Sequence, residues 1–199
     1  MKHAIEQFEF IINETRHISN IYAHFNIPNA LDDLLRWQWT QAVSALDKYI
    51  HDIVTLGLIK AFNKEISQTR SFSNFTIPIS IIYDSVNSSY FFNQFIVKKL
   101  SYQSFQTPDK IGEALSLIWP EEHKWQKIGL SLDEDATTIK NTLNLIAQRR
   151  NQIVHQSDYP SENLERESIT IKQATWVIDY IDKLVHSLHN ELNSYLSTS

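Results

Sequence analysis

The sequence predicts an all-α protein. Three glycines and five prolines in 199 residues allow few sharp turns, and apolar residues recur at helical spacing over four long stretches. A hydrophobic share of 42% is enough to bury one substantial core. We therefore expect a single domain over residues 1–199, built on an antiparallel four-helix-bundle core with additional short helices inserted between the second and third long helices.

Two long helices are predicted in the first third of the chain. The first covers about residues 5–25, and Asn26-Ile27-Pro28 is expected to end it. The second covers about residues 31–62 and has the clearest apolar stripe in the sequence, formed by Leu35, Trp39, Val43, Leu46, Ile50, Ile53 and Val54.

The following insert, residues 63–130, has a less regular pattern and no indicated role. β-branched residues on both sides of Pro78 favour an extended connection over residues 72–83. Apolar and aromatic residues resume over residues 90–105. Thr107-Pro108-Asp109 is typical of a helix start, which predicts a short helix over residues 108–119, and a helical turn is expected within residues 121–130.

The last third predicts two more long helices. Ser131-Leu132-Asp133-Glu134 resembles a capping box, which indicates that the third long helix begins there. The segment Ser157-Asp158-Tyr159-Pro160-Ser161 is expected to end it. The fourth helix is predicted over about residues 169–196, with a regular apolar stripe along one side.

The net charge of −5 argues against a protein that binds nucleic acid through its overall field. Any such contact must be local. The basic residues that could form a local patch are equally consistent with scattered solvated side chains; they are Lys98, Lys99, Lys124, Lys127, Lys140, Arg149 and Arg150. The absence of cysteine, of a signal-peptide core and of any apolar run long enough to span a bilayer leads us to expect a cytoplasmic protein without a membrane partner.

Arg150 interrupts the apolar stripe of the third long helix. On an ideal helix it projects close to Leu143 and Ile146. A buried guanidinium needs a negatively charged partner, because its desolvation costs several kcal/mol. That partner is a structural acid such as Asp47, a ligand phosphate or a group from a second subunit.

Asn151 and His155 lie four residues apart on one face of the same helix, directly after Arg150. An amide and an imidazole could therefore reach one substrate, while the arginine holds phosphate oxygens. Arg150 and His155 project roughly 140° apart on an ideal helix. A joint site would then need either a distorted last turn or a second chain.

The segment Arg150-Asn151-Gln152-Ile153-Val154-His155 resembles the pattern of the HEPN superfamily, in which an arginine is followed by a polar residue, a short spacer and a histidine on the third bundle helix. Residues 31–58 and 130–188 also resemble the signature helices of the RiboL-PSP-type HEPN group. The resemblance implies a helical bundle that forms a homodimer, with a composite site at the subunit interface. In active members it implies metal-independent endoribonuclease activity.

In such a mechanism no cofactor or metal is needed, because the ribose 2′-hydroxyl attacks the adjacent phosphorus. His155 is expected to act as general acid or base, Arg150 to stabilise charge on the phosphoryl oxygens, and Asn151 to orient the phosphate or the imidazole. The products would be a 2′,3′-cyclic phosphate and a 5′-hydroxyl. A toxin, phage-defence or stress-response setting would add an antitoxin or regulatory protein as a partner. The alternative is a non-catalytic HEPN-like module that binds RNA or docks onto a protein.

A polar seam lies beside the apolar stripe of the second helix and contains Asp47 and His51. Asp47 could hold Arg150 or orient His155, with His51 and Arg149 in supporting or substrate-binding roles. The seam could equally be solvated, with Asp47 and His51 as a surface pair four residues apart. HEPN proteins that pair with a nucleotidyltransferase often have a tyrosine two residues after the histidine, where this sequence has Ser157.

Overall fold

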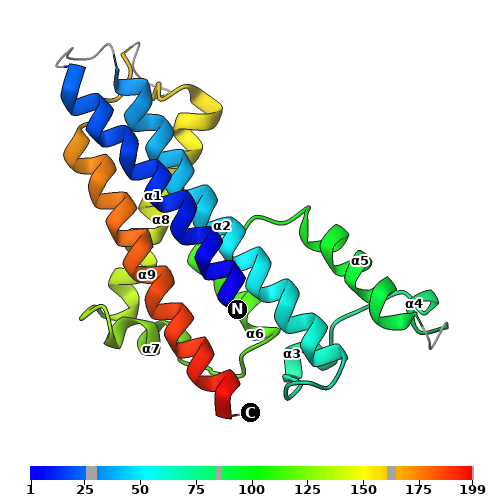
Figure 1. Ribbon diagram of the computed structural model, residues 1–199. Coiled ribbons are helices and arrows are strands. Elements are labelled where there is room, and N and C mark those ends of the chain that lie inside the picture. Colours follow the sequence, from blue (N-terminus) through cyan, green and yellow to red (C-terminus); the bar gives the residue numbers. More distant parts are fainter. Residues whose placement is uncertain (26–30, 84–86, 161–164, 199) are drawn as a thin grey trace.

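The computed structural model describes residues 1–25, 31–83, 87–160 and 165–198. Within these ranges every regular element is a helix, which confirms the all-α prediction. Four helices are long: α1 (Lys2–Phe25), α2 (Asp32–Phe62), α8 (Ala136–Gln156) and α9 (Ile171–Thr198). Figure 1 shows them running lengthwise beside one another, α1 and α8 in one direction and α2 and α9 in the other. Asn26-Ile27-Pro28, expected to end the first helix, lies outside the described residues.

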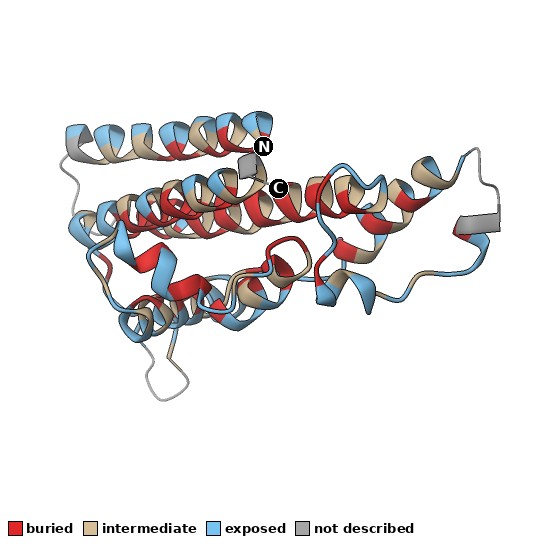
Figure 2. Cartoon of the chain, turned by 90° about the horizontal axis from the view of Figure 1, so that it is seen from below, coloured by how far each residue is buried: buried red, intermediate tan, exposed pale blue. Residues whose placement is uncertain are grey.

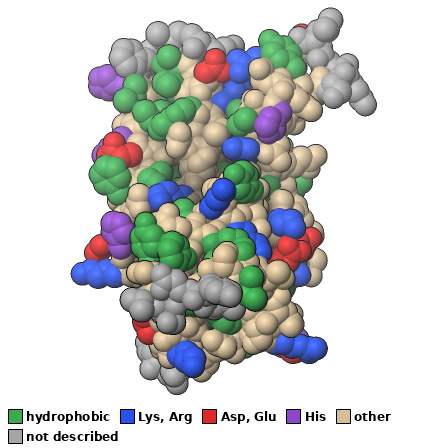
Figure 3. All heavy atoms as spheres, turned by 90° about the vertical axis from the view of Figure 1, so that its right-hand side faces the viewer, with side chains coloured by type: hydrophobic (Ala, Val, Ile, Leu, Met, Phe, Trp, Pro, Cys, Tyr) green, Lys and Arg blue, Asp and Glu red, His purple; other side chains and the backbone are tan. Residues whose placement is uncertain are grey.

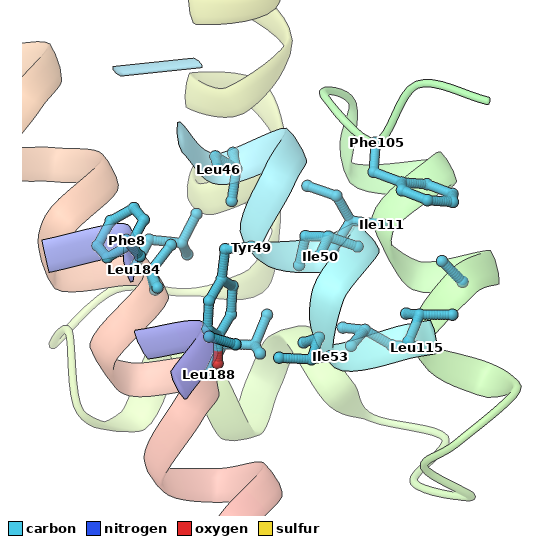
Figure 4. Packing of buried hydrophobic residues seen from close by; sticks show 14 of the residues in the cluster. Phe8, Leu46, Tyr49, Ile50, Ile53, Phe105, Ile111, Leu115, Leu184 and Leu188 are labelled. Carbon is cyan, nitrogen blue, oxygen red and sulfur yellow. The ribbon is translucent and has the colours of Figure 1, made fainter. Parts of the chain in front are cut away.

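Helix α2 is the centre of this arrangement, because it packs against α1, α8 and α9 and also against two helices of the insert. Its apolar residues therefore face more than one neighbour, and the inward faces of the surrounding helices are buried (Figure 2). Figure 4 shows side chains of α1 and α9 on one side of α2 and side chains of the insert on the other. Those drawn with labels are at most 2% exposed: Phe8, Leu46, Tyr49, Ile50, Ile53, Phe105, Ile111, Leu115, Leu184 and Leu188.

The insert between α2 and α8 contains short helices, as expected. They are α3 (Arg70–Ser73), α4 (Ser80–Tyr83), α5 (Ser88–Leu100), α6 (Pro108–Ser116) and α7 (Lys124–Leu130). The prediction of an extended connection over residues 72–83 is wrong at both of its ends, where α3 and α4 form single helical turns. The Thr69 side chain accepts a hydrogen bond from the Phe72 amide and so caps α3, because local capping outweighs a weak β-propensity.

The predicted start of α8 at the Ser131 capping box is also wrong. Asp135 is the N-cap, and its side chain accepts hydrogen bonds from the amides of Thr137 and Thr138 at 2.8 and 3.0 Å. The residues before it form a turn that follows α7, in which the Glu134 amide donates to the Gly129 carbonyl. A Cβ at position 129 would overlap the Glu134 carbonyl oxygen, so only glycine permits this close turn.

A polar contact joins α1 to α9 outside the core. The His186 ring bonds Glu9 of α1 through Nε2 at 3.0 Å and the Asp182 carbonyl through Nδ1 at 2.9 Å. Arg16 of α1 reaches the carboxylates of Asp179 and Asp182 on α9 at 2.9 and 2.6 Å. Partial burial lowers the pKa of His186, but its hydrogen bonds and the charges of Asp182 and Glu9 outweigh this effect and raise the pKa above its ordinary value.

This raised pKa predicts a pH-dependent stability. His186 stabilises the folded protein fully below its unfolded pKa of about 6.5, and the contribution is lost as the pH rises through the higher folded value. The difference in unfolding free energy between the wild type and His186→Gln, measured by urea denaturation over a pH range that begins at about 6.5 and extends upward, should therefore shrink as the pH rises. A difference that stays constant over this range would contradict the prediction.

Candidate functional site

The end of α8 brings the three predicted catalytic residues to one groove. Arg150, Asn151 and His155 all line a hollow of about 760 Å³. Its other wall is formed by the loop between α5 and α6 and the first turns of α6, with Tyr102, Gln103, Ser104, Gln106, Thr107, Lys110 and Glu113. Helix α8 continues without a break to Gln156. The three residues therefore border one groove within a single chain and without a distorted last turn.

A second hollow of about 460 Å³ adjoins the first and shares Thr107, Asn151 and His155 with it. Its remaining lining is rich in side-chain amides, from Asn144, Gln148, Gln152 and Gln156. Amides donate and accept hydrogen bonds but carry no charge. The two hollows together offer a polar surface along α8 with Arg150 at one part of it.

The Arg150 guanidinium is incompletely paired. Its Nη1 donates to Asn151 Oδ1 at 3.2 Å, whereas its Nε is buried and has no hydrogen-bond partner in the described part of the chain. No ion pair among the described residues includes Arg150. Since an unsatisfied buried donor costs about 1–3 kcal/mol, this guanidinium is suited to an anion that enters the groove.

His155 is exposed at the groove, one helical turn beyond Asn151. Within residues 1–25, 31–83, 87–160 and 165–198, no hydrogen bond or ion pair holds either nitrogen of its ring. An imidazole in this position can exchange a proton with a bound ligand. None of the described residues therefore fixes its orientation through a hydrogen bond or an ion pair.

Arg149, predicted in a supporting role, lies in a buried ionic cluster and does not line the groove. Its guanidinium contacts Asp158 at 2.9 Å and Glu167 at 2.6 Å. Arg36 of α2 contacts the same oxygen of Asp158 at 2.7 Å and donates to the Glu167 carbonyl. The Asp158 side chain is fully buried, and that of Arg36 is 6% exposed.

Arg36 and Asp158 were not predicted as site residues from the sequence. Arg36 directly follows Leu35 of the apolar stripe, so the burial argument used for Arg150 could have singled it out. Asp158 and the preceding Ser157 have left-handed backbones, with φ of 66° and 51°, and the Asp158 amide bonds the Gln152 carbonyl at 3.2 Å. The cluster thereby ties the turn that follows His155 to helix α2.

Asp47 and His51 contact the other wall of the groove. Asp47 Oδ1 accepts a hydrogen bond from the Phe105 amide, and His51 Nε2 lies 3.1 Å from the Leu100 carbonyl. The His51 and Phe105 rings pack with their centroids 4.5 Å apart. The contacts found for Asp47 and His51 among the described residues therefore go to the two ends of the loop over residues 101–104, and none of them is a hydrogen bond or ion pair to Arg150 or His155.

Comparison with known protein families identifies the family of this chain. The model of the RiboL-PSP-HEPN family matches residues 6–194. The chain belongs to this family. A HEPN domain is associated with nuclease and other RNA-related functions. No curated protein and no solved structure matches the chain.

The rest of the described surface of this HEPN domain shows no site for a metal ion and no membrane-spanning helix. Figure 3 shows basic and hydrophobic side chains intermixed over the middle of the face that carries α4 and α5. Among the described residues, no group of three or more His, Asp or Glu side chains is placed to hold a metal ion. No helix in the same ranges is both long enough and apolar enough to cross a bilayer.

The buried cluster leads to a stability prediction. Asp158→Ala would remove the buried carboxylate that Arg36 and Arg149 share and leave Arg36 only the exposed carboxylate of Asp33 at 3.3 Å, so we expect a loss of about 3 kcal/mol in unfolding free energy by urea denaturation. Glu6→Ala is the matched control, because it breaks the exposed Lys2–Glu6 pair and should cost less than about 1 kcal/mol. If the two substitutions lower the unfolding free energy by the same amount, the buried cluster contributes no more to stability than an exposed ion pair.

Proposed function

We propose that this HEPN domain is a metal-independent endoribonuclease whose site comprises Arg150, Asn151 and His155. The observation that carries the proposal is the buried, unpaired Nε of Arg150 beside a polar groove that His155 also lines. A phosphodiester supplies the missing anionic partner, and RNA also supplies an internal nucleophile. The family match supports RNA as the class of ligand.

In the proposed reaction the ribose 2′-oxygen attacks the adjacent phosphorus and the bond to the 5′-oxygen breaks. His155 exchanges a proton with the reacting oxygens, while the Arg150 guanidinium stabilises the negative charge on the phosphoryl oxygens. Asn151 holds Arg150 through the hydrogen bond between its Oδ1 and Nη1. One proton leaves the 2′-hydroxyl and one joins the leaving 5′-oxygen, so the products are a 2′,3′-cyclic phosphate and a 5′-hydroxyl.

The surroundings of the groove also favour a phosphate. The first turn of α6 borders it through Thr107 and Lys110, and the partial positive charge at a helix N-terminus attracts anions. Lys110 pairs with Glu113 at 2.9 Å in an exposed contact, and screening by water makes such a contact weak enough to exchange for a phosphate.

The proposal includes a homodimer, in which a second copy contributes its own Arg150 and His155 to a composite site. Two histidines would allow one to act as base and the other as acid in a single cleavage step. It also includes a toxin, phage-defence or stress-response setting, with an antitoxin or regulatory protein that controls the activity.

The direct test is cleavage of RNA by the purified protein in the presence of EDTA. Arg150→Ala and His155→Ala should each lower the cleavage rate by about 10²-fold or more, with 5′-hydroxyl ends detected by kinase labelling of the products. Arg70→Ala and His17→Ala are the matched controls, because both side chains are exposed away from the groove. If cleavage persists unchanged in both groove variants, these residues do not form the site.

A second candidate function is RNA or protein binding without catalysis. The absence of an orienting partner for His155 among the described residues favours it, because general acid–base groups are commonly held by a neighbour. In that case the protein would bind RNA with an affinity that Arg150→Ala lowers, and every RNA tested would remain intact. RNA that remains intact but binds in an Arg150-dependent manner would therefore show that the protein binds RNA without cleaving it.

A further inference from the structure

Tyr102 is an exposed aromatic residue at the groove. Its exposed fraction is 81%, and it lines the same hollow as Arg150 and His155. No ring contact or hydrogen bond of the Tyr102 side chain is found among the residues that the structure describes. The residue therefore contributes little to folding, and its exposed ring is available for a ligand.

The loop that carries Tyr102 is fixed at both ends. At one end the Leu100 carbonyl lies 3.1 Å from His51 Nε2, and at the other the Phe105 amide donates to Asp47. The Phe105 side chain is 2% exposed and packs on the His51 ring. Only residues 101–104 lie between these two anchors, so the exposed ring is presented from a short, restrained segment.

We propose that Tyr102 is a base-binding residue, which stacks on an unpaired nucleobase next to the phosphate held by Arg150. This inference rests on the proposed function. Every nucleobase has a π-face that an aromatic side chain can cover, but a base inside a duplex is already stacked on both sides. Gln103 and Ser104 of the same loop supply polar groups for the edge of that base or for its sugar. The site accordingly selects RNA with an unpaired base beside the phosphate.

Asp47 is in this arrangement a positioning residue. Its carboxylate oxygen accepts the Phe105 amide and so holds the loop in place, without a contact to the ligand. An asparagine retains an oxygen that can accept the same hydrogen bond, whereas an alanine does not. The two substitutions therefore separate the hydrogen bond from the negative charge.

The test measures binding separately from cleavage. The probe is a fluorescein-labelled 2′-O-methyl oligonucleotide, which lacks the nucleophilic hydroxyl, as a single strand and as a blunt duplex; affinity is measured by anisotropy at one salt concentration. Tyr102→Ala should weaken binding of the single strand about tenfold or more, and Tyr102→Phe should bind like the wild type. Duplex binding should not change. Tyr90→Ala is the matched control, since Tyr90 is 62% exposed but does not line the groove.

Unchanged single-strand affinity in Tyr102→Ala, or equal losses for single strand and duplex, would overturn the inference. For the loop anchor, Asp47→Ala should weaken single-strand binding and Asp47→Asn should restore it, with both proteins shown to be folded by circular dichroism. Equal losses in both Asp47 variants would overturn the positioning role.

The outcomes also separate this inference from the proposed function. Tyr102-dependent binding of the single strand by a protein that cleaves no RNA would leave the base-binding site standing and remove the ribonuclease. If cleavage requires Arg150 and His155 but single-strand binding does not depend on Tyr102, the ribonuclease proposal stands and the base-binding role of Tyr102 is wrong.

Discussion

The burial of α2 on nearly all of its sides is the constraint on which the rest of the structure depends. Because this helix packs against α1, α8, α9 and two helices of the insert, several of its polar side chains reach neighbours in different directions. Trp39 Nε1 donates to the Ile146 carbonyl of α8 at 3.1 Å, Arg36 reaches the turn after α8, and Asp47 with His51 reaches the loop before α6. Both walls of the groove are therefore positioned from one rigid element.

The adjacent arginines of α8 show how differently two identical side chains are used. Arg149 is surrounded by Asp158, Glu167 and two backbone carbonyls, so its role is to stabilise the fold. Arg150 comes one residue later and about 100° further around the helix. Among the described residues its guanidinium has only the Asn151 side chain as a partner. Charges with complete partners fix the geometry of a site, whereas charges without them remain available for a ligand.

Helical periodicity predicted the long helices closely, because the spacing of apolar residues is a local property of the chain. The same reasoning singled out Arg150, since a charge within an apolar stripe is visible in the sequence. The cluster of Arg36 and Asp158 was missed because these residues are 122 positions apart in the sequence. A local sequence pattern cannot predict contacts between residues so far apart along the chain. The contacts of Asp47 and His51 could not be predicted either, because their partners are backbone groups of a loop. The start of α8 was misplaced because Ser131 and Asp135 are both good caps, and only the turn at Gly129 decides between them.

Binding of an anion at Arg150, as proposed above, would also link the stability of the protein to the supply of that ligand. A group that binds only the folded state shifts the folding equilibrium by mass action, and here it would also relieve an unsatisfied buried donor. Molecules without ligand should therefore open locally around the end of α8 more often than occupied ones. Proteases in the cell act on such open forms, so the abundance of this protein would follow the concentration of the anionic ligand that fills its groove.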